Sequence, residues 1–307
     1  MDFLERYLGW MKARRPEFGA LRFAVDCSNG MASLLVHELF PGAVILNDTP
    51  DGTFPCHSPN PLKAEAREQL AACVRENGLD CGVIFDGDAD RAMFVDERGD
   101  FVQPDYLIPV VADATRRACA PGAGGARPVV LHDVRTSRGA IEALRERGFE
   151  PAMVPVGHAF AKPKMRELRA ICGGELAGHY YFGDFFGCDS GALAAMRVLG
   201  EVAAAKDRGA AFSEMMRPIV SRYANSGEQN FRVEDKDAAI ARALAVAAGF
   251  GDETGRSEID GVRVEFADGW VSVRKSNTEP YLRLLVEAGD RETLDRRVDA
   301  LRRAIAG

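Results

Sequence analysis

The 307-residue sequence lacks the features that mark secreted, zinc-binding and membrane-spanning proteins. Its seven cysteines are scattered and none forms a CxxC pair, which predicts reduced thiols in a cytosolic (cytoplasmic) protein and argues against a disulfide framework or a zinc site. No apolar run approaches membrane-spanning length, and residues 1–20 lack a signal-peptide core. The net charge of −7 argues against a general nucleic-acid binder.

The order of predicted elements divides the chain into three units. In the first unit, strands are expected near 21–25, 44–46 and 82–85, and helices near 31–40 and 63–77. This alternation predicts a mostly parallel sheet with helices on both faces. The glycine-rich stretch 121–125 precedes a repeat of the same theme. We therefore expect two βαβ-type α/β domains with mixed sheets, followed by an α+β domain with an antiparallel sheet, at residues 1–105, 106–220 and 221–307.

Three aspartates alternate with other residues directly after a predicted buried strand, in the segment FDGDADR. In extended backbone, alternate side chains point the same way, so Asp86, Asp88 and Asp90 would converge on one spot. Three carboxylates cannot stay ionised that close together unless a cation neutralises them. Carboxylate oxygens suit a hard divalent ion, and Mg²⁺ is the first expectation.

Two other interpretations of this segment stay open at this point. The spacing resembles an EF-hand calcium loop, and Glu97 falls at the twelfth position of that loop. However, Arg91 stands at the sixth position, where the EF-hand needs glycine, and a strand is expected before the loop where the EF-hand needs a helix. A solvated acidic turn is the plainer alternative, because charged runs are common in loops.

Two further loops have compositions that are typical of ligand binding. Residues 173–179 (GGELAGH) surround Glu175 and His179 with small residues, so backbone can approach a ligand closely while these two side chains bind hydroxyls or move protons. Residues 274–278 (RKSNT) offer two cations, two hydroxyls and an amide, which are the donors that a phosphate accepts from, and Arg283 is expected on the same side. A tight surface turn and a polar hairpin loop are the alternatives.

Weaker positive clusters lie in the second unit. Arg135 and Arg138 follow a predicted strand, and His158 comes shortly before Lys162 and Lys164. Each cluster suits an anion, although a solvated helix face explains the lysines equally well. A metal loop, a Glu/His loop and a phosphate-like loop on three units together indicate phosphoryl chemistry on a polyhydroxylated substrate, in a cleft between domains.

The segments 86–91, 173–179 and 274–280 resemble three of the four active-site motifs of the α-D-phosphohexomutases, which comprise phosphomannomutases and phosphoglucomutases. The segments TPDG (49–52), PNP (59–61), DVR (133–135) and GH (157–158) are similar to that family as well. The resemblance covers nearly the whole chain in order. It implies a Mg²⁺-dependent isomerase that interconverts hexose 1-phosphate and hexose 6-phosphate, of mannose, glucose or both, through a bisphosphate.

The resemblance also implies a role for each candidate residue. The implied metal ligands are Asp86, Asp88 and Asp90. The implied catalytic residues, which transfer protons or contact phosphate, are Arg91, Arg135, His158 and His179. The implied substrate-binding residues are Glu175, Ala177 and His179 in the sugar loop, and Arg274, Ser276, Asn277, Thr278 and Arg283 around the phosphate that does not react.

Three departures from the family pattern stand out. Ala177 stands where the sugar loop often has serine, which removes one hydroxyl contact. Arg135 stands where some relatives carry lysine, and arginine stays charged and cannot act as a general base as lysine can. The serine motif of the first family domain, of the form TASHNP, is absent. The similar CHSPNP at 56–61 lies in a segment that resembles the second domain, so Ser58 is rejected as the nucleophile.

The sequence thus predicts family domains two to four without the domain that carries the catalytic serine, and nothing in the chain would then donate or accept phosphate covalently. A non-catalytic module that binds sugar phosphates, and a partner subunit completed by a separate first-domain chain, are the alternatives to an enzyme. Neither nucleic acid nor a membrane is an expected partner. One glutamate-containing loop can serve both sugars, so the choice between mannose and glucose stays open.

Overall fold

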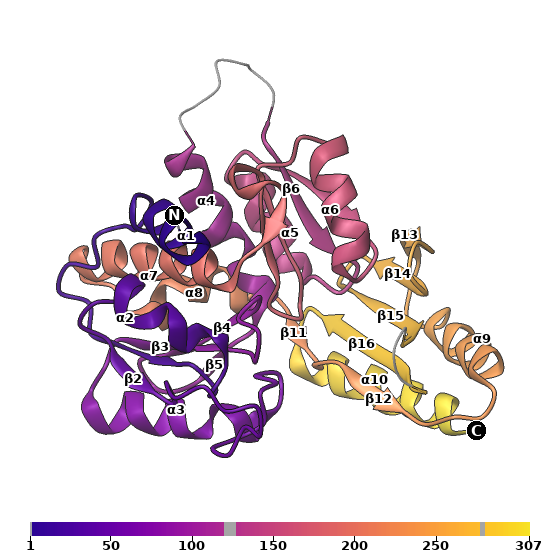
Figure 1. The fold of residues 1–307 in the computed structure, drawn as a ribbon. Helices are drawn as coiled ribbons and strands as arrows, with labels where there is room; N and C mark the ends of the chain where they lie inside the picture. Colours follow the sequence, from indigo (N-terminus) through magenta and orange to yellow (C-terminus); the bar gives the residue numbers. More distant parts are fainter. Residues whose placement is uncertain (1, 120–126, 277–279) are drawn as a thin grey trace.

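Three β-sheets follow one another along the part of the chain that the structure describes (Figure 1). This computed structural model describes residues 2–119, 127–276 and 280–307. The strand order is β2-β1-β3-β4-β5, then β10-β9-β8-β6-β7, then β11-β16-β15-β14-β13, with β12 also paired to β16. The predicted fold class is confirmed, since two α/β units with mixed sheets precede an α+β unit. We keep 1–105, 106–220 and 221–307 as the proposed bounds of the first, second and third units.

The first unit has a parallel half and an antiparallel half. Strands β1, β2 and β3 are parallel, and β4 and β5 continue the sheet in antiparallel pairing. Every residue of the central strand β3 is buried, which explains its continuous apolar run. The elements are α1 (Phe3–Lys12), β1 (Phe23–Asp26), η1 (Met31–Leu34), α2 (Val36–Leu39), β2 (Val44–Leu46), α3 (Ala64–Asn77), β3 (Cys81–Phe85), β4 (Ala92–Asp96) and β5 (Phe101–Val102).

The helix expected near 31–40 is broken into the short 3₁₀-helix η1 and the single turn α2. The cause is a tertiary contact at its start, where the backbone N–H of Met31 donates to the carbonyl of Gly87 at 2.9 Å. Gly30 lies so close to this loop that a Cβ there would be 2.5 Å from the Gly87 oxygen. Contact with the aspartate loop therefore overrides the local helical pattern.

The second unit repeats the arrangement around a new parallel core. Strand β6 pairs in parallel with β7 and β8, and β9 and β10 add antiparallel strands. The short helix η2 (Pro104–Leu107) crosses the proposed bound between the two units. The other elements of the second unit are α4 (Ile108–Ala118), β6 (Val129–Asp133), α5 (Arg138–Glu146), β7 (Glu150–Val154), α6 (His158–Glu167), β8 (Cys172–Gly174), β9 (Tyr180–Phe182), η3 (Gly183–Phe185), β10 (Cys188–Asp189), α7 (Gly191–Asp207) and α8 (Phe212–Val220).

The first and second units share one hydrophobic core. Helix α7 contacts both α4 and β4, so it lies between the two units (Figure 1). Its buried face, which includes Leu193 and Met196, joins a single cluster that also contains Phe85 and Phe94 of the first sheet and Val130 of the second. A shared core of this kind fixes the two sheets relative to each other.

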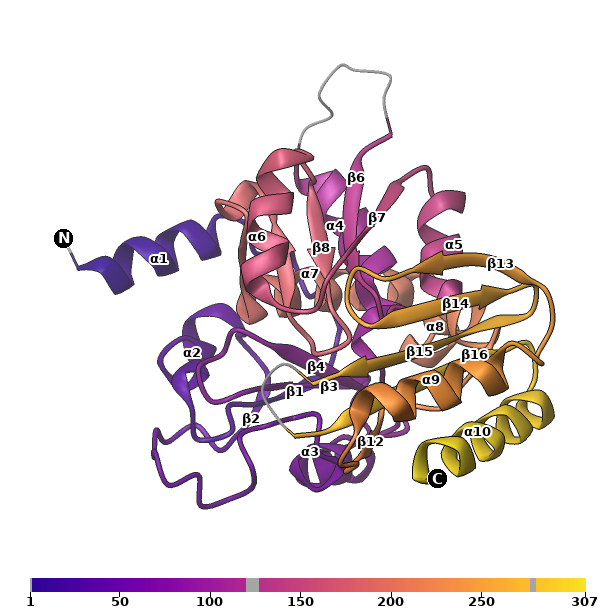
Figure 2. The same cartoon turned by 90° about the vertical axis from the view of Figure 1, so that its right-hand side faces the viewer.

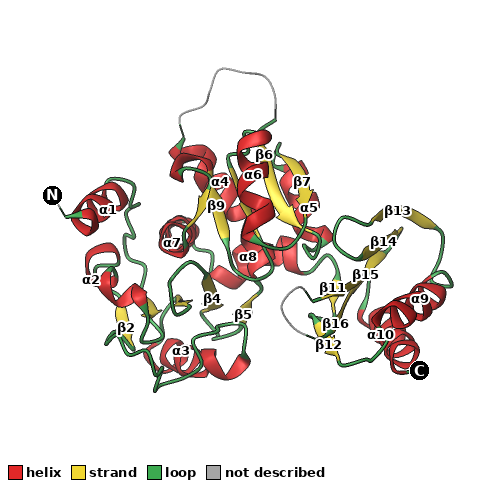
Figure 3. Cartoon of the chain, turned by 45° about the vertical axis from the view of Figure 1, so that its right-hand side comes forward, coloured by secondary structure: helices red, strands yellow, loops and turns green. Residues whose placement is uncertain are grey.

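The third unit has a core of its own. Helices α9 and α10 pack together against one face of its sheet (Figures 2 and 3). The cluster that they bury contains residues of this unit alone. The elements are β11 (Ala224–Asn225), β12 (Gln229–Phe231), α9 (Lys236–Ala247), β13 (Glu253–Ser257), β14 (Val262–Phe266), β15 (Gly269–Lys275), β16 (Leu282–Ala288) and α10 (Arg291–Ala306).

Two expectations about the whole chain can be compared with this fold. All seven cysteines are free thiols, as their scattered positions predict. Among the described residues, the search for a helix with the length and apolar character of a membrane span finds none.

Candidate active site

The three aspartates of the FDGDADR segment come together in the turn between β3 and β4. One oxygen from each of Asp86, Asp88 and Asp90 lies within 4.8 Å of the others. The predicted convergence is present, but extended backbone does not produce it. The strand ends at Phe85, and Ala89 takes a left-handed conformation (φ 63°) that folds the loop back on itself.

This turn is buried on one side, which contradicts both alternatives considered for it. Asp86 is only 1% exposed and Asp90 is half-buried, so the segment is not fully solvated, although Asp88 is exposed. Strand β3 precedes the loop and β4 follows it, whereas an EF-hand needs a helix on either side. The loop belongs to the carboxyl end of a central strand, where ligand-binding loops of such sheets lie.

The electrostatics of the loop favour a cation. Burial raises the pKa of Asp86, even though Arg91 opposes the shift by donating from Nε to Oδ2 at 2.6 Å. Burial and the neighbouring charge of Asp86 raise the pKa of Asp88. Asp90 Oδ1 is buried without a hydrogen-bond partner among the described residues. Acceptor-only oxygens that repel one another fit Mg²⁺, which prefers carboxylate ligands.

Backbone contacts join the aspartate loop of the first unit to the glycine-rich loop of the second. Arg91 and His179 form an antiparallel bridge, and the Ala92 N–H donates to the Gly178 carbonyl at 3.2 Å. Gly178 has a φ of 88°, and a Cβ there would lie 2.8 Å from the Met93 side chain. Glycine is therefore needed at 178 both for the backbone conformation and for the close approach.

His179 faces carboxylates from two units. Its Nδ1 lies 3.1 Å from Asp189 Oδ2 and 3.6 Å from Asp90 Oδ2. Lys162 in turn pairs with the other oxygen of Asp189 at 2.9 Å. Burial disfavours the charged imidazole, but Asp189 and Asp90 outweigh it and raise the pKa of His179. The arrangement places a proton-carrying ring beside the aspartate loop.

Glu175 is buried in the same loop, and its position excludes a surface turn. The side chain is 2% exposed and accepts a 2.6 Å hydrogen bond from the Tyr181 hydroxyl. Burial, with the charge of Asp133 nearby, raises the pKa of the Glu175 carboxyl. Arg135 Nη2 lies 3.8 Å away from Glu175 Oε2. Ala177 lies half-buried two residues further on.

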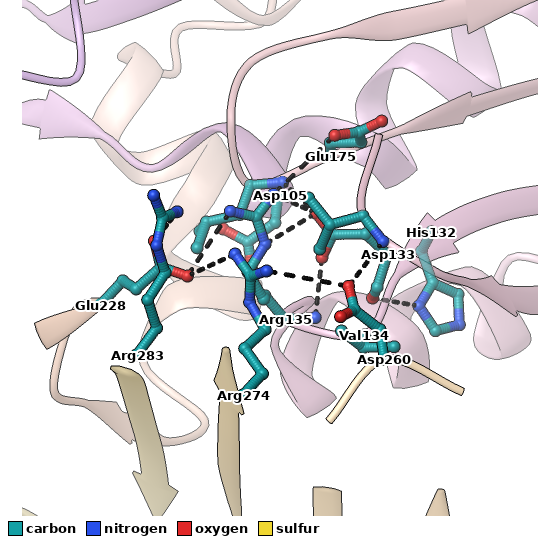
Figure 4. Close-up of polar contacts among 12 residues, drawn as sticks. Asp105, His132, Asp133, Val134, Arg135, Glu175, Glu228, Asp260, Arg274 and Arg283 are labelled. Carbon is teal, nitrogen blue, oxygen red and sulfur yellow. Dashed lines mark hydrogen bonds and ion pairs between the residues drawn. The ribbon is translucent and has the colours of Figure 1, made fainter. Parts of the chain in front are cut away.

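A cluster of three arginines lies where the second and third units meet (Figure 4). Arg135 donates from Nε and Nη2 to Asp133 Oδ2, at 3.0 and 2.5 Å. Arg274 and Arg283 lie opposite each other on β15 and β16. A glutamate, Glu228, faces all three arginines.

The rest of the predicted phosphate loop is described only at its start. The Ser276 N–H donates to the Tyr281 carbonyl at 2.9 Å, where β15 leads toward β16. Asn277 and Thr278 lie outside the described residues.

Sequence models of three consecutive protein domains match this chain. Domain II of phosphoglucomutase/phosphomannomutase matches residues 2–99, domain III matches 103–223, and the C-terminal domain matches 228–304. The chain belongs to the phosphoglucomutase/phosphomannomutase family.

Individual relatives agree with this assignment. The chain is 35% identical over 311 residues to a protein named "Phosphohexose mutases" from Xanthomonas campestris pv. campestris, covering 99% of this chain and 66% of that protein. It is 35% identical over 299 residues to a phosphomannomutase of Escherichia coli K12, covering 92% of this chain and 61% of that protein. A crystal structure of a phosphoglucomutase/phosphomannomutase family protein from Burkholderia thailandensis superimposes with a TM-score of 0.84 at 30% identity, covering 99% of this chain and 64% of that one. The chain thus spans less than two-thirds of the length of these relatives.

The family motifs do not all lie together in this structure. The predicted site residues of the aspartate loop, the sugar loop and the arginine cluster are linked to one another by contacts. His158, in contrast, is exposed at the start of α6. Its segment does approach the third unit, since the Val156 N–H donates to Asp260 at 3.0 Å. The roles assigned to the individual phosphohexomutase residues remain predictions.

Asp189 and Glu228 were missed by the sequence reasoning. Asp189 stands ten residues after His179, and Glu228 stands far from the arginines that it faces. The only signal for Asp189 was the polar step CDSG after a run of aromatic residues. Glu228 has no signal of its own in the sequence, because a single glutamate in a polar connection is ordinary.

Proposed function

We propose that this chain is the metal-, sugar- and phosphate-binding part of a phosphohexomutase that interconverts hexose 1-phosphate and hexose 6-phosphate. Mannose phosphates, glucose phosphates or both are the proposed substrates, with a hexose bisphosphate as the intermediate and Mg²⁺ as the cofactor. The contact between the aspartate loop and the sugar loop carries this proposal. The Arg91–His179 bridge supports a metal loop and a sugar loop that act on one bound substrate.

Each loop has a proposed task in that reaction. Asp86, Asp88 and Asp90 would hold Mg²⁺, which supplies positive charge to a phosphoryl group in transfer. Glu175 would accept hydrogen bonds from sugar hydroxyls through Oε2, because the Tyr181 hydroxyl donates only to Oε1. The His179 ring, whose pKa Asp189 and Asp90 raise, would donate a proton or a hydrogen bond to a sugar or phosphate oxygen beside the metal loop.

The arginine cluster would hold the opposite end of the substrate. A guanidinium group gives a phosphate two parallel hydrogen bonds, and Arg274 still has a buried Nε without a hydrogen-bond partner among the described residues. Arg135 keeps its charge and serves as an anion ligand. A fixed phosphate at this end and a metal at the other would place the sugar against Glu175.

Turnover tests the proposal directly. The chain is assayed for interconversion of mannose 1-phosphate and mannose 6-phosphate, and of the glucose phosphates, with Mg²⁺ and a catalytic amount of the bisphosphate. The assay is repeated with a separately produced first domain that carries the serine motif. We expect turnover in the combined sample. Absence of turnover both with and without the added domain would contradict the proposal.

A non-catalytic role is the second candidate, and one observation favours it. Arg135 cannot act as a general base, unlike the lysine that some family members carry there. A sugar-phosphate-binding module would keep the three loops without the covalent step. A partner subunit would keep the same loops and depend on a separate first-domain chain for that step. Calorimetric titration with mannose 6-phosphate, combined with the turnover assay, separates the module from an enzyme, because a module binds the ligand yet gives no turnover with any added domain.

A further inference from the structure

Glu228 lies between β11 and β12 and directs its carboxylate at three arginines (Figure 4). Its Oε2 lies 2.9 Å from Arg283 Nη1. Its Oε1 lies 3.2 Å from Arg274 Nη2 and 3.6 Å from Arg135 Nη1. The three arginines come from two different units, so this one carboxylate connects the second unit to the third.

The arginines would repel one another without this carboxylate. Arg274 and Arg283 are direct cross-strand partners on β15 and β16, and like charges in that position destabilise a sheet. Arg135 adds a third positive charge from the β6–α5 turn and gives Nε and Nη2 to its own partner, Asp133. Its Nη1 is left directed toward Glu228.

A carboxylate in this place can make the same contacts with the arginines as a bound phosphate group would. Both groups accept paired hydrogen bonds from the planar guanidinium fork. Arg274 and Arg135 are each only 3% exposed, so an anion from solvent reaches them only after something moves aside. The Arg274 Nε stays buried without a hydrogen-bond partner among the described residues, so the cluster offers more donors than Glu228 uses.

We propose that Glu228 occupies the place of the substrate's phosphate when the site is empty, and that a hexose phosphate binds by displacing this carboxylate from the arginines. This inference rests on the proposed function, because it assumes that the arginine cluster is the phosphate site. Displacement has a consequence for selectivity. A phosphate dianion replaces the carboxylate with more charge and more acceptor oxygens, whereas a carboxylate ligand or a neutral sugar gains nothing over Glu228.

The test measures affinity in the full chain without any need for turnover. Inorganic phosphate and glucose 6-phosphate are titrated calorimetrically into the wild type and into Glu228→Gln. Removing the competitor should tighten binding of both ligands by at least about fivefold, the low end of typical coupling between two binding events. Glu228→Asp keeps the charge and withdraws the carboxylate by one methylene. This second variant provides a test if the Gln variant does not fold, and it should give a smaller gain in affinity.

A matched control separates displacement from the simple loss of a negative charge. Asp260 lies 3.8 Å from Arg274 Nη1 but faces only that arginine of the cluster among the described residues. Asp260→Asn removes the same charge and should tighten phosphate binding less than Glu228→Gln does. An equal gain in the two variants, or weaker binding in Glu228→Gln, overturns the displacement proposal while the phosphate site stands. If neither the wild type nor Glu228→Gln binds phosphate or glucose 6-phosphate, the proposed phosphate site itself fails, and the displacement proposal fails with it.

Discussion

Arg138, the first residue of α5, connects the second unit to the third through its side chain. Its guanidinium donates to Glu265 Oε2 at 2.7 Å and to the carbonyls of Phe266, Ala267 and Gly269 at 2.7 to 3.0 Å. The side chain is 16% exposed, so water replaces few of these bonds. The sequence predicts a weak anion binder at Arg138, whereas the structure shows that it holds the β14–β15 hairpin against α5.

Arg138→Ala should therefore loosen the third unit. Hydrogen bonds that involve a charged group contribute about 1.5–3 kcal/mol each, but bonds that share one guanidinium do not add. Arg263 still donates to Glu265 Oε1 at 2.6 Å, so Glu265 Oε2 and the three carbonyls lose a donor while the carboxylate stays paired. We expect a loss of about 3 kcal/mol in the free energy of unfolding of the third unit, the upper end for one hydrogen bond that involves a charged group.

The matched control, Arg256, lies in the third unit. Arg256 pairs with Glu253 at 2.7 Å on the exposed strand β13, and both side chains are 40% exposed. Exposed pairs of this kind contribute at most about 1 kcal/mol. Arg256→Ala should therefore change little, and it should leave the contact with the second unit intact.

Urea unfolding and hydrogen exchange measure the difference. Because the third unit has its own core, Arg138→Ala should unfold it at a lower urea concentration than the first two units. Amide exchange should accelerate in β14, β15 and α5. A loss no larger than that of Arg256→Ala, with one unchanged transition, would refute the reasoning.

Three further predictions concern the candidate site. Mg²⁺ at about 100 times its Kd should stabilise the wild type by about 2.7 kcal/mol. Asp88→Asn should abolish that rise in Tm, and Asp100→Asn, at an exposed site outside the loop, should retain it. Asp189→Asn removes the carboxylate that accepts from His179 Nδ1. Nitrogen-15 spectra should then show a lower pKa for the His179 ring, because a carboxylate that raises it is gone, whereas exposed Asp207→Asn leaves that pKa unchanged. Burial raises the pKa of Asp105 to about 7, so the folded state favours the protonated form. The stabilisation from Asp105, about 4 kcal/mol below pH 3.8, is lost progressively as the pH rises from 3.8 to about 7, and Asp105→Asn should flatten the urea stability between about pH 5 and 7.

The sequence predicts the fold well wherever local patterns determine the secondary structure. Buried strands such as β3 and β6 are short apolar runs followed by polar turns, and that pattern predicts both the parallel sheets and the edge where the loops lie. Helix α8 and strand β13 were not predicted. Strand β13 (ETGRS) is polar and mostly exposed at the edge of its sheet, so it has no apolar period to detect.

Contacts between units decide what the sequence could not predict about the site. The alternating spacing correctly predicts that the three aspartates converge. The structure shows that a turn, and not an extended strand, brings them together. The pairing of His179 with Asp90, and of Glu228 with Arg135, joins residues about 90 positions apart on different units. Composition and periodicity describe one element at a time, and they contain no information about which loops face each other.

The two ends of the proposed substrate site are held in different ways, and this difference follows from the cores. Backbone contacts fix the aspartate loop to the sugar loop, and the first two units share one core. Apart from the connecting turn, no backbone–backbone hydrogen bond joins the second and third units among the described residues. Side chains such as Arg138 and Glu228 make that connection instead, and side-chain ion pairs can exchange partners without unfolding a sheet. The metal end should therefore stay rigid while the phosphate end adjusts to its ligand. In the active enzyme, substitutions in the Glu228 cluster should accordingly alter KM more than kcat, and substitutions of the three aspartates should alter kcat more than KM.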